Sequence, residues 1–164
     1  MTLEEYWDWS LTRYGCHSTR ELLLNLQETT GLVIMEALFA AWMGDRGFRW
    51  KRSAVEQISI ATSAWIEEVV LPLRATRKRW KPDHGLRAQR EQLQQLEVEA
   101  ERHLAQLMWE AVMNAPHDAA AISHEPEHGV PSLMEVNLAL LPVFYDGKNV
   151  SQRKQLVALL SQPT

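Results

Sequence analysis

Apolar side chains recur every three to four residues along most of the chain, a spacing that is typical of amphipathic helices. In the first part of the chain this spacing predicts helices over residues 2–15, 18–29 and 32–43, with Gly15 and Gly31 ending the first two. The third segment is apolar almost all round, and such a helix normally packs against neighbours on several sides. We therefore expect residues 32–43 to form the central helix of the fold.

A proline interrupts the next helical pattern. Apolar residues follow one face from Ser53 onwards until the chain meets Pro72, whose ring would clash with the carbonyl oxygen of Glu68 in a regular helix. The pattern resumes after the proline and continues to Trp80, where residues 81–85 read Lys-Pro-Asp-His-Gly, a cluster of helix breakers. These features predict one helix that is kinked at Pro72.

The remaining pattern predicts a long fifth helix over residues 86–114 and two shorter helices over 132–141 and 151–160. No segment alternates apolar and polar residues as a half-buried strand does, so we expect no strands. The predicted fold is an all-α, single-domain bundle of six or seven helices. Its expected parts within residues 1–164 are a helical core over 1–115, a polar loop over 116–131 and C-terminal helices over 132–164.

Four of the expected helix starts carry the pattern of a capping box. In this motif a Ser or Thr side chain accepts a hydrogen bond from the third helical N–H group, and a Glu at that third position reaches back. We expect Ser53→Ala to lower the free energy of unfolding by about 0.5 to 2 kcal/mol through loss of such a cap. The four pairs are Thr2/Glu5, Ser18/Glu21, Ser53/Glu56 and Ser132/Glu135.

The composition is that of a soluble globular protein, since 46% of the 164 residues are apolar and 23% are charged. Cys16 is the single cysteine, which excludes an intramolecular disulfide. The first ten residues carry acids where a signal peptide carries bases. The longest nearly uncharged run, residues 32–44, is shorter than the ~20 residues of a membrane span. We expect a cytoplasmic protein without a membrane-spanning segment.

The formal net charge of −4 conceals a basic segment in the middle of the chain. Residues 46–90 hold eleven Lys and Arg side chains against four Asp and Glu, and the rest of the chain is acidic. Such an asymmetry favours an electropositive surface that meets an anionic partner. The alternative is that the solvated faces of a helical protein have segregated charge without a functional role.

Two groups of cations in this segment adjoin Trp50 and Trp80, which with Trp9 lie outside the apolar helical patterns and are expected to be exposed. The second group recurs at helical spacing and is expected to form one exposed stripe. Cations beside an aromatic ring are typical of nucleic-acid grooves. Two simpler explanations stay open, since cations suit the last turn of a helix and Arg side chains often cover a tryptophan. The predicted binding residues are Arg49, Lys51, Arg52, Arg74, Arg77, Lys78, Trp80 and Lys81.

Residues 124–128 read His-Glu-Pro-Glu-His and match the H-E-x-x-H pattern, in which two histidines on one helix face bind zinc and the glutamate acts as general base. Pro126 and the following Gly129 prevent a continuous helix, so the two histidines cannot share a helix face. We expect no catalytic zinc site here. A weak metal site formed with His117 and Asp118, or a plain solvated loop, fits the sequence better.

Two further positions are candidates for chemistry. Glu36 is the only ionisable side chain between Gly31 and Gly44, and burial there would raise its pKa into the range for proton transfer. Its neighbours on a helical wheel instead favour a position at the solvent edge. Cys16 adjoins His17, but a nucleophilic thiolate needs a base across space and an orienting third group, so an inert thiol is expected.

Several segments resemble a family of small uncharacterised proteobacterial proteins, a domain of unknown function. The resemblance covers roughly residues 6–113, and the family usually has Asp and Asn where this chain has Val33 and Met35. It implies a bacterial, soluble, helical protein and supplies no activity and no catalytic residue. The segments that carry it are Tyr6-Trp7-Asp8-Trp9-Ser10-Leu11, Leu26-Gln27-Glu28-Thr29-Thr30-Gly31, Leu38-Phe39 with Trp42, and Val69-Val70-Leu71-Pro72-Leu73-Arg74-Ala75-Thr76-Arg77.

The motifs of common enzyme classes are missing from the sequence, including the P-loop, the dinucleotide-binding glycines and the nucleophile elbow. We therefore predict a non-enzymatic binding or adaptor protein without a cofactor. Its basic kinked-helix surface is expected to contact an acidic protein or RNA, including one on the ribosome. The alternative is a small helical enzyme, such as a metal-dependent hydrolase, that uses Glu36 or the histidine-rich loop.

Overall fold

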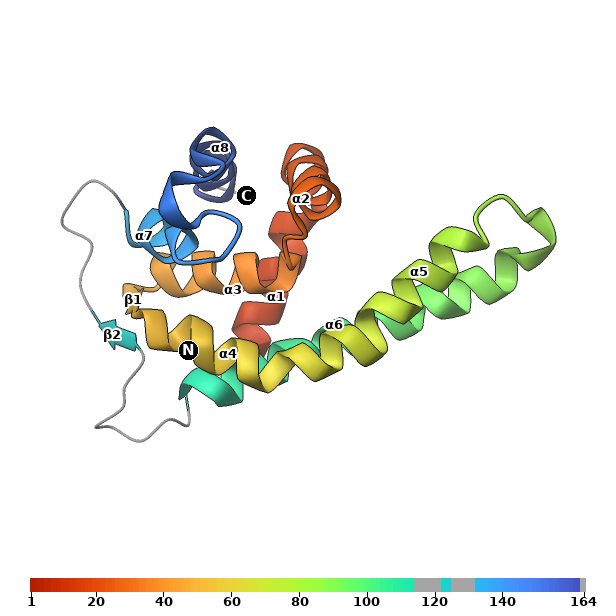
Figure 1. The fold of residues 1–164 in the computed structure, drawn as a ribbon, viewed down its shortest axis with the longest axis horizontal. Coiled ribbons are helices and arrows are strands. Elements are labelled where there is room, and N and C mark those ends of the chain that lie inside the picture. The colour runs from red at the N-terminus through yellow and green to blue at the C-terminus, as the bar shows by residue number, and fades with distance from the viewer. Residues whose placement is uncertain (114–121, 125–131, 163–164) are drawn as a thin grey trace.

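The chain folds as an all-α protein, as the helical spacing of its apolar residues predicts (Figure 1). The computed structural model describes residues 1–113, 122–124 and 132–162. None of the described helices is long and apolar enough to cross a membrane. The α-helices are α1 (Leu3–Gly15), α2 (His17–Thr30), α3 (Ile34–Asp45), α4 (Arg52–Trp65), α5 (Leu71–Arg79), α6 (Arg87–Met113), α7 (Leu133–Ala139) and α8 (Val150–Leu160).

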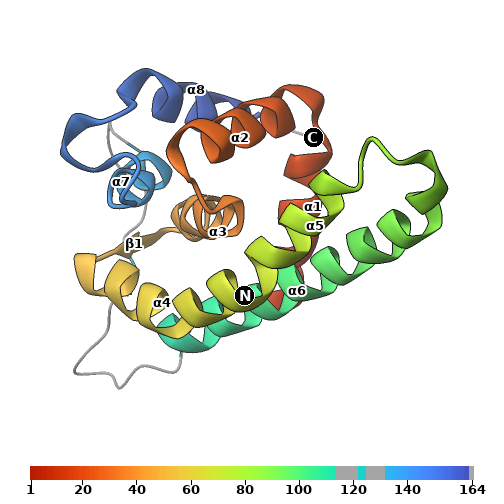
Figure 2. The ribbon, with the colours of Figure 1, turned by 45° about the vertical axis from the view of Figure 1, so that its right-hand side comes forward.

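Helix α3 forms the centre of the fold, as its sequence predicts, although it begins two residues later than expected. All residues from Ala37 to Gly44 are buried, and α1, α2, α6 and α7 pack around them (Figure 2). The Tyr6 hydroxyl of α1 donates a hydrogen bond to the carbonyl oxygen of Met35 at 2.9 Å. A Cβ atom on Gly44 would overlap the backbone of Met134, so α7 lies directly against α3. These neighbours give an apolar helix a buried surface on every side.

Helices α4 and α5 form one continuous arm that runs antiparallel to α6, and we call this pair the hairpin (Figures 1 and 2). A π-helical turn, Ile66–Val70, joins the two helices, and the Leu71 N–H donates to the carbonyl oxygen of Ile66. A π turn is wider than an α turn and gives room for the ring of Pro72. The arm therefore continues through Pro72 as predicted, with its irregularity in the turn before the proline. The far end of the hairpin extends beyond the other helices in Figure 1.

Two short strands correct the expectation that the chain has none. Strand β1 (Phe48–Trp50) pairs antiparallel with β2 (Ile122–His124), and Phe48 lies opposite His124. Three residues are too few to show an alternating pattern, and this pairing joins segments far apart in the sequence. Trp50 is only 2% exposed, so its predicted exposure is wrong. Its backbone N–H donates to Oδ1 of Asn137 on α7 at 2.8 Å.

The helix starts agree only in part with the four expected capping boxes. Thr2 has the complete box, since its hydroxyl accepts from the Glu5 N–H at 3.2 Å and its own N–H donates to the Glu5 carboxylate at 2.7 Å. Ser132 caps α7 through its side chain. Ser18 and Ser53 are not caps, because α2 and α4 begin one residue earlier and enclose them in the first turn. The cap loss expected for Ser53→Ala is therefore wrong.

Candidate functional site

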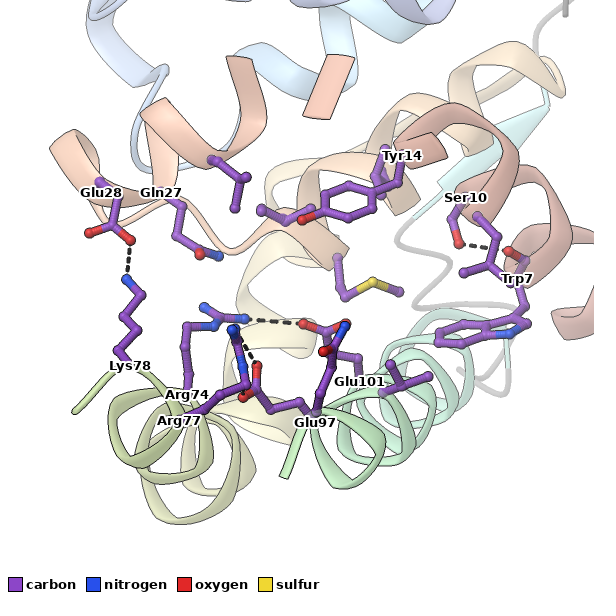
Figure 3. Close-up of a pocket in the computed structure, with 17 residues that line it drawn as sticks. Trp7, Ser10, Tyr14, Gln27, Glu28, Arg74, Arg77, Lys78, Glu97 and Glu101 are labelled. Carbon is purple, nitrogen blue, oxygen red and sulfur yellow. Dashed lines mark hydrogen bonds and ion pairs between the residues drawn. The ribbon is translucent and has the colours of Figure 1, made fainter. Parts of the chain in front are cut away.

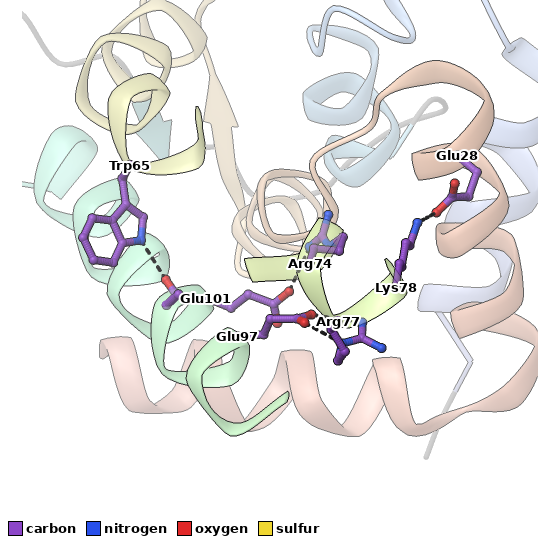
Figure 4. A network of polar contacts seen from close by, with 8 residues as sticks. Glu28, Trp65, Arg74, Arg77, Lys78, Glu97 and Glu101 are labelled. Atoms are coloured by element: carbon purple, nitrogen blue, oxygen red, sulfur yellow. Dashed lines mark hydrogen bonds and ion pairs between the residues drawn. The ribbon is translucent and has the colours of Figure 1, made fainter. Parts of the chain in front are cut away.

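Ion pairs hold α5 against α6, as Figure 4 shows. Nη2 of Arg74 lies 3.1 Å from Oε1 of Glu101, and Arg77 makes two bonds to Glu97, including one of 3.0 Å between Nη2 and Oε2. The Glu97 side chain is only 9% exposed. The hydrogen bonds that Arg77 donates to Glu97 raise the pKa of the Arg77 guanidinium, which stays charged. Two arginines three residues apart on α5 thus meet two glutamates four residues apart on the antiparallel helix.

This network changes the interpretation of the predicted basic stripe. The Arg74 side chain is 17% exposed, and Arg77 is half-buried, so these cations do not lie on a solvated face as expected. Lys78 is exposed but pairs with Glu28 on α2, and this contact lowers the pKa of the Glu28 carboxyl. The three cations therefore fasten the hairpin to itself and to the body of the protein.

A cleft of about 190 Å³ opens beside the network, between the hairpin and helices α1 to α3 (Figure 3). Its wall is apolar and includes Trp7 and Met35, and its rim carries Leu11, Leu24 and Val98, which are large side chains that remain exposed. The ion pairs line the other side. An apolar surface beside a few convergent charges is typical of a site for an amphipathic ligand.

Burial controls the polar groups inside this cleft. Burial raises the pKa of the Glu101 carboxyl, and the neighbouring Arg74 offsets part of that shift. Burial, and then the charge of Glu101, raises the pKa of the Tyr14 hydroxyl. Nε2 of Gln27 is buried and has no hydrogen-bond partner among the described residues. The cleft can therefore donate and accept hydrogen bonds, and none of the residues named here forms a nucleophile and base pair.

The far end of the hairpin is basic. Residues 79–90 contain four basic side chains against one acid, Asp83. Asp83 accepts the N–H of Gly85 at 2.9 Å, so its carboxylate is used in the turn. Within the described part of the chain, Arg79 and Lys81 are exposed and make no ion pair. The four cations, which we call the basic end, are Arg79, Lys81, Arg87 and Arg90.

The eight predicted binding residues do not form one surface. Arg49, Lys51 and Arg52 lie where β1 meets α4, and the Arg52 guanidinium stacks over the Tyr145 ring at 4.2 Å from its centroid. Lys81 lies at the opposite end of the arm, on the order of 40 Å away at about 1.5 Å per helical residue. Trp80, half-buried, and exposed Lys81 both lie at the far end of the hairpin.

The ion-pair network and the basic end both contain residues that the sequence did not predict. Glu97 and Glu101 are not among the predicted residues, although their four-residue spacing on the long helix matches that of partners for the arginine stripe. Arg87 and Arg90 belong to the basic segment but are not among the predicted binding residues. No motif marks them, because their position at the end of the hairpin depends on the turn between α5 and α6.

Glu36 lies in a more buried setting than the helical wheel indicated. The side chain is half-buried between α3 and α4, and burial raises its pKa to about 7, while a hydrogen bond with Thr62 opposes the shift. Its charge contributes to the raised pKa of the buried Tyr6 hydroxyl. The expected position at the solvent edge is therefore only half right. Glu36 lines neither the cleft nor the basic end.

The remaining candidates offer no assembled chemistry. Cys16 is an exposed free thiol, with Sγ 3.7 Å from the carbonyl oxygen of Thr12. His124 belongs to β2, and the rest of the histidine-rich segment, 125–131, lies outside the described residues. Among the residues that the structure describes, no three His, Cys, Asp or Glu side chains are grouped so that they could hold a metal ion.

The protein is all-α, with a charged hairpin and a cleft at the side of the hairpin. The chain belongs to the family described as Protein of unknown function (DUF2390), whose family model matches residues 5–108. This match confirms the resemblance to a domain of unknown function, over residues 5–108 where roughly 6–113 was predicted, and the proteobacterial origin stays a prediction. The matched segment runs from α1 into α6 and contains the cleft and the basic end. No curated protein and no solved structure matches the chain.

Proposed function

We propose that this protein is a non-enzymatic binding or adaptor protein of the bacterial cytoplasm that contacts an acidic protein or RNA through the basic end of the hairpin. The observation that carries the proposal is the position of Arg79 and Lys81, which are exposed at the extremity of a projecting arm and lack ion-pair partners among the described residues. Exposed cations of this kind attract anionic partners and steer their approach. A partner on the ribosome is included in this proposal.

The ion pairs of the hairpin support this function indirectly. Arg74, Arg77 and Lys78 were predicted to touch the partner, and we now assign them a positioning role. They hold α5 on α6 and the hairpin on α2, and so fix the position of the basic end. A rigid surface loses little conformational entropy when a partner binds. Trp80 stands beside this surface and could stack on a base if the partner is RNA.

The proposal is tested by affinity capture from a bacterial lysate at low salt, with and without nuclease. Arg79→Glu with Lys81→Glu should abolish capture, whereas Lys148→Glu with Lys154→Glu changes the net charge equally on exposed residues outside the hairpin and should retain it. Nuclease-sensitive capture identifies RNA as the partner, and nuclease-resistant capture identifies an acidic protein. Undiminished capture by the hairpin variant overturns the proposal.

The second candidate function, a small helical enzyme, draws on the Glu36 pKa of about 7, which suits a general acid or base. The histidine-rich segment is its other basis, and we expect the purified, untagged protein to hold no stoichiometric zinc because Pro126 opposes the helical arrangement of the ligands. Elemental analysis checks this expectation. One zinc per chain that is lost on changing His124 and His128 would replace the binding proposal with a hydrolase.

A further inference from the structure

A second hollow, of about 250 Å³, lies at the far end of the hairpin, and we call it the tip pocket. It adjoins the cleft, since Arg77 and Gln94 line both. Its lining comes from α5, from α6 and from the 3₁₀ turn His84–Leu86 that joins them. The lining residues are Arg77, His84, Arg87, Arg90, Glu91 and Gln94.

The tip pocket contains a guanidinium group that no carboxylate neutralises. Of the three arginines in its lining, Arg77 pairs with Glu97 and Arg87 pairs with Glu91. Arg90 has no carboxylate partner among the described residues. Glu91 accepts a hydrogen bond from Nε of Arg87 at 3.0 Å. Nε of Arg90 is buried and has no partner among the described residues. Because an arginine in a protein stays protonated, this buried donor calls for an acceptor that the described residues do not supply.

The helix that begins at the pocket adds to this imbalance. Helix α6 is 27 residues long, and its N-terminal end carries the partial positive charge of the helix dipole. The first turn of α6 has no acidic residue and carries Arg87 and Arg90, and the acid that precedes it is Asp83, which caps the 3₁₀ turn that leads into the helix. An anion in the pocket would offset both the arginines and the helix end.

The geometry points to a phosphate group as the occupant, and we propose that the tip pocket is a phosphate-binding site. A carboxylate is planar and is satisfied by one guanidinium fork, whereas a tetrahedral phosphate offers oxygens in several directions. Arg87 and Arg90 of α6 supply guanidinium groups from one side, and Arg77 of α5 adds the nitrogen that Glu97 does not engage. The phosphate belongs to an RNA backbone or to a small phosphate ester. This inference rests on the proposed function, because it specifies that the anionic partner carries a phosphate group.

Binding measured at constant ionic strength tests the site, with inorganic phosphate, acetate and a single-stranded oligouridylate as probes. Arg87→Gln with Arg90→Gln should weaken phosphate binding by about tenfold or more, since each lost bond to a charged group is costly. Lys148→Gln with Lys154→Gln removes the same charge from exposed residues outside the hairpin, leaves the pocket lining intact, and should leave phosphate binding nearly unchanged. Acetate should bind the unaltered protein more weakly than phosphate does.

Circular dichroism controls for folding, and Arg90→Lys gives a milder variant that keeps the charge but removes the buried Nε donor. It should bind phosphate more weakly than the unaltered protein. Loss of both phosphate and oligouridylate binding in the Arg87/Arg90 variant identifies an RNA phosphate, and loss of phosphate binding alone identifies a small ester. The inference is overturned if phosphate does not bind, if it binds no more tightly than acetate, or if the Arg87/Arg90 variant binds it as well as the unaltered protein does. Lysate capture that still depends on Arg79 and Lys81 in that case leaves the proposed function standing.

Discussion

The Glu36 carboxyl links the stability of the fold to pH. Its pKa rises from 4.5 to about 7 on folding, because burial disfavours the charged form. The folded state therefore holds this proton more tightly than the unfolded state between these values. The contribution of Glu36 to stability falls as the pH rises from 4.5 to about 7 and is level above that. The full shift corresponds to a destabilisation of about 3 kcal/mol at high pH.

Replacing the carboxyl with an amide should remove this dependence. We expect Glu36→Gln to be more stable than the unaltered protein at pH 8, by up to about 3 kcal/mol, and nearly equal to it at about pH 4. Urea unfolding at both pH values measures the difference. Glu99→Gln, on an exposed position of α6, is the matched control and should show no such pH-dependent gain. A pH-independent offset for Glu36→Gln would contradict the linkage.

Changing only one partner of the Arg77 and Glu97 pair should have a large effect on the free energy of unfolding. Arg77→Met leaves the Glu97 carboxylate, which is 9% exposed, without its cation, and should lower the free energy of unfolding by about 3 kcal/mol or more. Arg79→Met removes an exposed cation two residues away and should change it by about 0.5 kcal/mol or less. Adding Glu97→Gln to Arg77→Met should recover most of the loss. Chemical denaturation of the three variants checks this, and equal effects of the two Met variants would argue against the pair.

At the scale of elements, the sequence predicted where the helices lie more accurately than it predicted the residues at which they begin. Runs of apolar residues at helical spacing identified each long helix, because this periodicity averages over many positions. A capping box depends on one residue, and the chain can begin a helix earlier when the preceding backbone permits it. Cys16 and Lys51 occupy the N-cap positions of α2 and α4 without side-chain caps.

This difference between caps gives a matched pair of substitutions. Thr2→Ala should lower the free energy of unfolding by about 1 kcal/mol, because it removes the side chain that accepts the Glu5 N–H. Ser53→Ala should change it by about 0.5 kcal/mol or less, since Ser53 lies inside α4. Thermal melts of both variants measure the two effects. A larger loss for Ser53→Ala than for Thr2→Ala would show that α4 begins at Ser53 after all.

For the whole molecule, the sequence predicted the all-α class and the central helix, because both follow from composition and periodicity along the chain. It could not predict which cations stay free, since that depends on pairs such as Arg77 and Glu97, which are 20 residues apart. Between residues 74 and 90, the cations thus divide into those that hold the hairpin and those that remain at its end. The β1 and β2 pairing depends on contacts still farther apart in the sequence.

The π turn between α4 and α5 sets the rotational phase of the arm. A π turn contains one residue more than an α turn. The side chains of α5 therefore point in the directions that they would have if the arm were a regular α-helix with one residue deleted. Each residue of an α-helix advances the side-chain direction by about 100°. If Ile66–Val70 became α-helical without losing a residue, Arg74 and Arg77 would turn by about that angle and leave the carboxylates of α6.

Deletions in the arm test how the ion pairs depend on the rotational phase of α5. In a background with Pro72→Ala, which removes the ring that needs the wide turn, deletion of exposed Glu67 should turn the π segment into an α turn while Arg74 and Arg77 keep their partners. Deletion of exposed Ala75 in the same background breaks the spacing between the two arginines. The first protein should melt close to the Pro72→Ala parent, and the second well below it. The register of the whole ion-pair network therefore depends on the presence of one extra residue in a single turn.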